Sequence, residues 1–161
     1  MRRSATFLAL LLLTSAPLVL FADSQALTAD DAWIREAPPG TDTTAAYMAL
    51  ENAGDEDVTL VHVGSPDFGR VEIHQTVTED GRTRMEKLDG LEIPAESSVE
   101  LAPGGKHLML LEAREQPQAG QMLTLVLEFD DGSLLDLMMP VRQETGRDDH
   151  DHHHEDHEGD A

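Results

Sequence analysis

The sequence predicts an all-β protein whose strands pack as a sandwich or a barrel. From about residue 31 to residue 142 the chain consists of short apolar stretches separated by turn residues. No part of this region carries the 3.6-residue period of an amphipathic helix, whereas short strands between frequent turns are typical of sandwiches and barrels. Roughly 110 residues of this kind are enough for one domain, so we expect a single fold.

Nine stretches have the length and composition of strands. In chain order they span residues 32–36, 46–52, 58–64, 69–78, 83–88, 98–101, 107–113, 122–129 and 134–141. They are separated by sequences that favour loops and tight turns. These are Pro38-Pro39-Gly40, Asn52-Ala53-Gly54, Asp80-Gly81, Asp89-Gly90, Pro103-Gly104-Gly105 and Asp131-Gly132. Two of these turns lie between strands close enough in sequence to form hairpins.

The first 26 residues have the layout of a secretory signal peptide. Met1-Arg2-Arg3 precedes an apolar run from Ala5 to Phe21, and small residues offer cleavage after Ala22 or after Ala26. After cleavage, no second apolar run is long enough to span a bilayer. An uncleaved anchor is the alternative, which the polar residues 23–25 disfavour. We therefore expect an exported, periplasmic protein with a folded domain over residues 27–145.

Residues 146–161 have a different composition, because nearly all of them are Asp, Glu, His or Gly. A polar segment without apolar residues cannot offset the entropy cost of ordering, so we expect a disordered tail. Its histidines are His150, His152, His153, His154 and His157. Imidazoles among carboxylates suit Cu(II), Zn(II) or Ni(II) better than Cu(I), which makes the tail a candidate secondary metal site. The alternatives are a charged terminus that only keeps the protein soluble, or an artificial extension.

The chain is strongly acidic and contains no cysteine. It has 32 Asp and Glu against 11 Lys and Arg, for a formal net charge of −21. Such a polyanion is repelled by nucleic acid and by anionic lipid, and it attracts cations and basic protein surfaces. Without disulfides, the domain must be held together by its hydrophobic core and by any metal that it binds.

Four residues have the donor chemistry of a monovalent copper site: His74, Met85, His107 and Met109. Thioether sulfur selects Cu(I), and imidazole suits copper in either oxidation state. Ten residues separate His74 from Met85, and twenty-one separate Met85 from the tripeptide His107-Leu108-Met109. A blue-copper electron carrier is excluded, because such a site normally requires a cysteine thiolate.

Local geometry brings these residues together as two pairs. If Asp80-Gly81 is a two-residue hairpin turn, Thr76 lies opposite Met85, and Met85 emerges one diagonal step from His74, at about 7–8 Å between backbones. His107 and Met109 share a face if they lie on one strand. The sequence alone does not establish that the two pairs face each other, and a bulge at the turn would change the first pair.

The remaining methionines and His62 have simpler interpretations. We expect Met48, Met122, Met138 and Met139 to be core filler or ordinary surface. His62 has no matching partner and is expected to be a solvated strand residue. Taken alone, Met109 fits a buried strand as well as a ligand, because apolar residues flank it on both sides.

The pattern of His74, Met85 and His107-Leu108-Met109 resembles the signature of the PCu(A)C family of periplasmic copper chaperones. The resemblance extends from Ala32-Trp33-Ile34-Arg35 through Ala45-Ala46-Tyr47-Met48 and Glu72-Ile73-His74 to Pro103-Gly104-Gly105-Lys106-His107, and includes Phe129-Asp130-Asp131-Gly132 and Pro140-Val141. Many members have a methionine at or near the position of Gln75, so no additional sulfur ligand is expected here.

This resemblance implies a Greek-key, cupredoxin-like β-sandwich that binds one Cu(I) through His74, Met85, His107 and Met109. It also implies delivery of copper toward the CuA centre of cytochrome c oxidase subunit II, or to another periplasmic copper protein. A protein that buffers copper or zinc without delivering it is the main alternative. An enzyme is disfavoured, because the chain has no Gly-Xaa-Ser-Xaa-Gly elbow, no cysteine nucleophile and no His-Glu-Xaa-Xaa-His pair.

Overall fold

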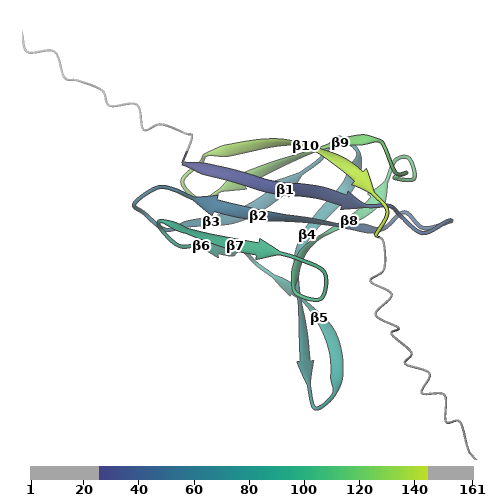
Figure 1. The fold of residues 1–161 in the computed structure, drawn as a ribbon, viewed down its shortest axis with the longest axis horizontal. Helices are drawn as coiled ribbons and strands as arrows, with labels where there is room; N and C mark the ends of the chain where they lie inside the picture. Colours follow the sequence, from purple (N-terminus) through teal and green to yellow (C-terminus); the bar gives the residue numbers. More distant parts are fainter. Residues whose placement is uncertain (1–25, 145–161) are drawn as a thin grey trace, which may run out of the picture.

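The computed structural model describes residues 26–144, which form ten β-strands and no helix (Figure 1). The strands are β1 (Leu27–Arg35), β2 (Thr44–Asn52), β3 (Val58–Gly64), β4 (Phe68–Glu79), β5 (Arg82–Leu88), β6 (Leu91–Ile93), β7 (Ser97–Leu101), β8 (Lys106–Ala113), β9 (Met122–Phe129) and β10 (Leu134–Arg142). Across this part of the chain, no helix is long and apolar enough to cross a membrane. The predicted all-β, single-domain fold is confirmed.

The strands form two antiparallel groups that share one continuous path of pairing. The order along the path is β5-β4-β8-β2-β1-β10-β9-β3-β6, and β7 pairs with the remaining part of β2. The groups meet where β1 and β10 run parallel, with Ile34 opposite Val141 and Arg35 opposite Arg142. Neighbours in this path are often far apart in sequence, so most of the sheet depends on long-range pairing.

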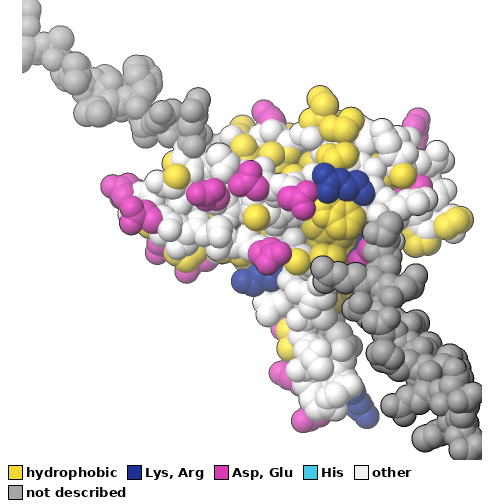
Figure 2. Space-filling model, in the orientation of Figure 1, with side chains coloured by type: hydrophobic (Ala, Val, Ile, Leu, Met, Phe, Trp, Pro, Cys, Tyr) yellow, Lys and Arg dark blue, Asp and Glu magenta, His cyan; other side chains and the backbone are white. Residues whose placement is uncertain are grey.

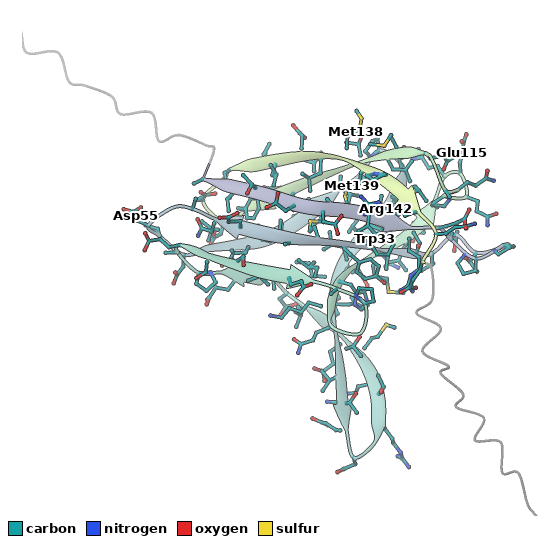
Figure 3. The ribbon with its side chains drawn as sticks, viewed as in Figure 1. Trp33, Asp55, Glu115, Met138, Met139 and Arg142 are labelled. Atoms are coloured by element: carbon teal, nitrogen blue, oxygen red, sulfur yellow. The ribbon has the colours of Figure 1, made fainter. Side chains whose placement is uncertain are left out.

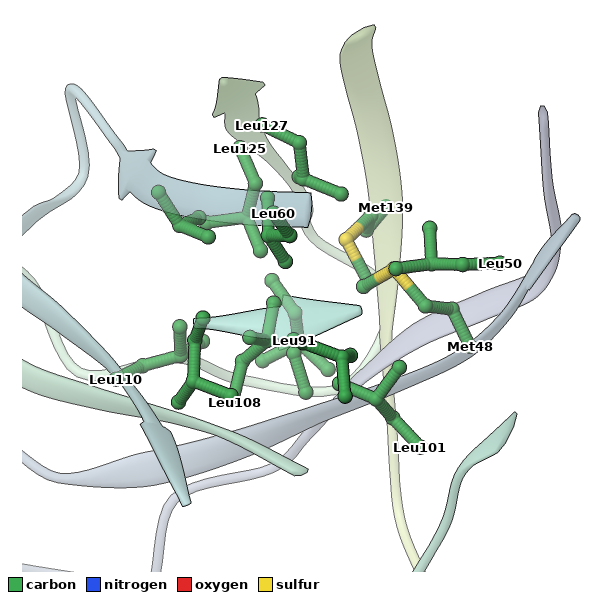
Figure 4. Packing of buried hydrophobic residues seen from close by; sticks show 14 of the residues in the cluster. Met48, Leu50, Leu60, Leu91, Leu101, Leu108, Leu110, Leu125, Leu127 and Met139 are labelled. Carbon is green, nitrogen blue, oxygen red and sulfur yellow. The ribbon is translucent and has the colours of Figure 1, made fainter. Parts of the chain in front are cut away.

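The apolar faces of the two groups enclose one core (Figure 4). Leu60 and Leu125 of one group and Leu50 and Leu108 of the other are at most 1% exposed. Burying such side chains stabilises the fold by roughly 1.5–3 kcal/mol each. Because the chain has no cysteine, this core must stabilise the domain without the disulfides that many small domains contain.

Two strands begin more than one residue before their predicted starts, the other predicted bounds agree to within one residue, and one strand was not predicted. Strand β1 begins at Leu27 and pairs with β2 from that residue, and β2 begins at Thr44, which pairs with β8. Polar residues near both strand starts thus join the sheet through their backbone. The prediction missed β6, which has only three residues. Leu91 and Ile93 are nevertheless 3% and 0% exposed, and β6 pairs with β3. Such a short strand is specified by its burial in the core more than by a recognisable local pattern.

Strands β4 and β5 form a long hairpin whose tip projects away from the rest of the domain (Figure 1). Its turn is Asp80-Gly81, with positive φ angles of 51° and 74°. Two consecutive residues with positive φ are the mark of a type I′ turn, which matches the twist of the two strands. Glu79 lies opposite Arg82, so the register predicted from the turn is confirmed.

Candidate metal centre

The hairpin brings Met85 to the same face as His74. Thr76 lies directly opposite Met85, and His74 lies opposite Lys87. Side chains that lie directly opposite in an antiparallel pair share a face, as do residues two apart on one strand. The predicted diagonal relation between His74 and Met85 is therefore present.

The other pair is added by β8, which lies on the far side of β4 from β5. His74 is directly opposite His107, and Glu72 is directly opposite Met109. The centres of the two imidazole rings are 5.9 Å apart. All four predicted residues thus project from the same face of three adjacent strands, β5, β4 and β8. The pairing of β4 with β8 answers the question that the sequence left open.

This face is the outer side of the sheet at this end of the domain. Alternate residues of the same strands, Ile73 and Leu108, point the other way and belong to the core at 5% and 0% exposure. On the outer face, His107 is only 6% exposed, whereas Met85 on the edge strand is 62% exposed. The four side chains therefore range from the buried imidazole of His107 to the exposed thioether of Met85.

Aromatic residues shield the His107 side of the group. The Tyr47 ring centre is 6.5 Å from that of His107, and the Trp33 ring centre is 4.8 Å from that of Tyr47. The Arg35 guanidinium lies 5.3 Å from the centre of the Tyr47 ring. Burial raises the pKa of the Tyr47 phenol. Trp33 lies on the face of the domain seen in Figure 3, near the end of β10.

Glu72 connects β4, the strand that carries His74, to the edge strand β5 by charge. Its Oε2 is 2.9 Å from His74 Nε2, and its Oε1 accepts a hydrogen bond of 3.0 Å from Lys87 Nζ. The Arg70 guanidinium is 3.6 Å from the same Oε1. The hydrogen bond with His74, followed by that from Lys87, lowers the pKa of the Glu72 carboxyl. Sequence reasoning gave no role to Glu72, although its place two residues before His74 puts it on the same strand face.

The Nδ1 atoms of the two imidazoles have different surroundings. His107 Nδ1 is 3.1 Å from the carbonyl oxygen of Gly105. His74 Nδ1 is buried and has no hydrogen-bond partner among the described residues. A buried polar atom without a partner costs free energy unless something else binds it, and a metal ion at this face would remove that cost. Two imidazoles with two thioethers are the donors that Cu(I) prefers.

No group of three or more His, Cys, Asp or Glu residues that could hold a metal occurs within residues 26–144. The four-residue group combines two histidines with methionines, which is a different kind of site.

The remaining methionines and His62 lie where the sequence predicts them. Met48 and Met139 are 2% and 0% exposed and lie among core leucines (Figure 4). Met122 and Met138 are 52% and 72% exposed, which confirms that they are ordinary surface. Met138 is labelled at the surface in Figure 3. His62 is exposed on β3, as expected. The predicted signal peptide, up to residue 25, and the predicted metal-binding tail, from residue 146, lie outside the described residues.

A family model described as "Putative lipoprotein LpqE-like" matches residues 27–141, which cover the whole described domain except its ends. The chain belongs to the LpqE-like family. The curated "Putative lipoprotein Lxx21020" of Leifsonia xyli subsp. xyli is 36% identical to it over 116 residues, which are 71% of this chain and 69% of that protein.

Solved PCuAC domains share the fold of this LpqE-like protein. The solution structure titled CuI-DR1885, from Deinococcus radiodurans, is 28% identical, with a TM-score of 0.61, and the match covers 75% of this chain and 83% of that one. The copper-bound PCuAC domain from PmoF2 has a TM-score of 0.63 at 24% identity, over 73% of this chain and 93% of that domain, which supports the fold alone. The resemblance to the PCu(A)C family and the cupredoxin-like fold are thereby confirmed.

Proposed function

We propose that this LpqE-like protein is a copper chaperone that binds one Cu(I) through His74, Met85, His107 and Met109. The observation that carries the proposal is the register of β5, β4 and β8, which gathers two imidazoles and two thioethers on one outer face. The similarity to a solved Cu(I)-bound protein with the same fold supports the same interpretation. The proposal gives no residue of the chain a catalytic role.

The four ligands are suited to carrying copper and releasing it. All four are neutral, so the site keeps the single charge of Cu(I), and the thioethers need no deprotonation to bind. Met85 is 62% exposed on the edge strand, whereas His107 is 6% exposed. A recipient can therefore replace Met85 first while His107 still holds the ion. Transfer by stepwise exchange of ligands never exposes a bare ion to water.

We propose the periplasm as the location and the CuA centre of cytochrome c oxidase subunit II, or another periplasmic copper protein, as the recipient. Export is supported by the signal-like residues 1–26 and by the lipoprotein description of the family. The domain boundaries remain those proposed from the sequence, with the copper-binding domain at residues 27–145. Buffering of copper or zinc without delivery is the second candidate function, since storage and delivery sites can share ligands.

A copper-transfer experiment distinguishes the delivery function from the buffering function. The protein loaded with one equivalent of Cu(I) is mixed with a purified, metal-free CuA domain, the two are separated, and copper is measured in each. Delivery predicts that most of the copper moves to the CuA domain faster than it moves to a small chelator of equal affinity. If the protein binds Cu(I) but retains it, the buffering function is supported and delivery is wrong.

The tail is proposed as a second, harder metal site. Residues 146–161 offer five imidazoles with carboxylates and no sulfur, which suits Cu(II) or Zn(II). Removing these residues should abolish most Cu(II) binding measured by calorimetry and leave Cu(I) binding nearly intact. Because histidine must be neutral to bind a metal, the tail should bind more weakly below about pH 6.5. Equal Cu(II) stoichiometry with and without the tail would remove this role from it.

A further inference from the structure

The hydrogen bonds around the two histidines select which nitrogen of each ring is free. A neutral imidazole carries one N–H and one lone pair, and only the nitrogen with the lone pair can bind a metal. The partner of the other nitrogen therefore decides which nitrogen can act as the ligand. In this protein the two partners differ, and they contact different ring positions.

Glu72 is held in a state in which it can only accept hydrogen bonds. Lys87 and Arg70 are both placed at its Oε1, at 3.0 Å and 3.6 Å. Two cations at one carboxylate oxygen favour the ionised form, which has no proton to donate. Its second oxygen, Oε2, is 2.9 Å from His74 Nε2. The N–H of His74 must therefore be on Nε2, which leaves the lone pair on Nδ1.

The surroundings of the His74 ring agree with this assignment. Its side chain is 12% exposed, and Nδ1 is buried with no partner among residues 26–144. A buried acceptor without a donor is costly in the metal-free protein and becomes satisfied when a metal ion binds it.

His107 has the opposite arrangement. Its Nδ1 is 3.1 Å from the carbonyl oxygen of Gly105, which can only accept a hydrogen bond. The N–H of His107 is therefore on Nδ1, and the lone pair is on Nε2. A backbone carbonyl and a side-chain carboxylate thus orient the two rings, one at each ring position.

We propose that Glu72 is a positioning residue that fixes the proton of His74 on Nε2, so that His74 binds Cu(I) through Nδ1 while His107 binds it through Nε2. The copper part of this inference rests on the proposed function. The tautomer of His74 does not, because it follows from the contact between Glu72 and the His74 ring. Lys87 lies on β5, so its ion pair with Glu72 also ties the strand that carries Met85 to the strand that carries His74.

The tautomers can be read directly by NMR, because Cu(I) has a closed shell and does not broaden the signals. Two-bond proton–nitrogen correlation spectra of the 15N-labelled full-length protein distinguish protonated from unprotonated ring nitrogens. We expect His74 to show the N–H on Nε2 before copper is added. One equivalent of Cu(I) should then shift Nδ1 of His74 and Nε2 of His107. A proton on Nδ1 of His74, or copper shifts at Nε2 of both rings, would overturn the inference.

Variants of Glu72 test its role separately from folding. In Glu72→Leu, which cannot accept a hydrogen bond, the preference for one tautomer should be lost and Cu(I) affinity should fall by roughly 10–100-fold in chelator competition. Glu72→Gln should restore the tautomer and most of the affinity, because its amide oxygen still accepts from Nε2. Glu112→Gln is the matched control, because Glu112 lies 3.8 Å from Arg70 and has no hydrogen bond to His74.

The outcomes distinguish this inference from the proposed function. If Glu72→Leu keeps both the tautomer and the affinity of the parent protein, the positioning role is wrong even though copper binds. If the parent protein binds no Cu(I), the proposed function fails, while the tautomer of the metal-free protein still decides the role of Glu72.

Discussion

Exposure differs sharply among the four candidate ligands, and this difference suggests that some of them hold copper while others release it. His107 is 6% exposed and packs near Tyr47, whereas Met85 is 62% exposed at the sheet edge. A buried ligand is held in place by its neighbours, and an exposed one is free to leave the metal. We therefore expect the histidines to retain copper and Met85 to control its exchange.

Replacing each methionine ligand with alanine tests its role in holding copper. Met85→Ala and Met109→Ala should each weaken Cu(I) binding more than about tenfold, which corresponds to 1.4 kcal/mol. Met85→Ala should leave the free energy of unfolding within about 0.5 kcal/mol of the parent, since the side chain is exposed. Met138→Ala is the matched control, because Met138 is 72% exposed on β10 and has no part in the site. Parental affinity in both ligand variants would exclude them as ligands.

The β4–β5 hairpin is the element that positions Met85, and it depends on one tight turn. Gly81 has a φ of +74°, and a Cβ at this position would meet nothing within 4 Å. Replacement by alanine therefore creates no clash and penalises only the left-handed backbone. The structure thus allows the backbone effect of the turn to be isolated from packing.

Gly81→Ala should destabilise the hairpin by about 1–2 kcal/mol. Hydrogen exchange at the amides of β5 should become faster, and Cu(I) affinity should fall because Met85 is held less firmly. Gly132→Ala is the control, since Gly132 has a φ of +82°, equally open surroundings and a turn that joins β9 to β10. It should carry the same backbone penalty without any loss of copper affinity. An equal loss of affinity in both variants would contradict the link between the hairpin and the site.

The hairpin also shows how far local sequence reasoning can reach. Asp80-Gly81 predicts the turn, the register and the shared face of His74 and Met85, because all of these depend on neighbouring residues. The pairing of β4 with β8 has no such signal, since strands far apart in sequence find each other through the core. Tyr47 reaches His107 from β2, the neighbour of β8, so its role also depends on long-range pairing. The contacts of Glu72 and Gly105 are close in sequence or lie within the hairpin, but they depend on side-chain conformations that no sequence pattern specifies.

Across the whole molecule, the negative charge and a bound metal ion both affect the stability of the fold. Figure 2 shows acidic side chains spread over the body of the domain with few basic ones among them. With a formal net charge of −21, the chain gains from binding a cation, and no disulfide supports its core. A bound copper ion would therefore stabilise the entire fold and not the site alone.

Adding Cu(I) should raise the melting temperature, because a ligand that binds only the folded state stabilises it by mass action. The gain is about 4 kcal/mol when the free ligand is at 1,000 times its Kd. A reductant can keep the copper monovalent during the scan without breaking any disulfide, since the chain has no cysteine. In His107→Ala the same addition should shift the melting temperature much less. An unchanged melting temperature in the parent protein would mean that copper does not prefer the folded domain.

X-ray absorption at the copper edge tests the central claim most directly. Full-length protein carrying one equivalent of Cu(I) should show nitrogen and sulfur scatterers in the same coordination shell, and the Met85→Ala, Met109→Ala double variant should lose the sulfur. Because the histidine tail contains no sulfur, it cannot produce this signal. A Cu(I) spectrum with nitrogen and oxygen neighbours alone would contradict a site made of His74, Met85, His107 and Met109.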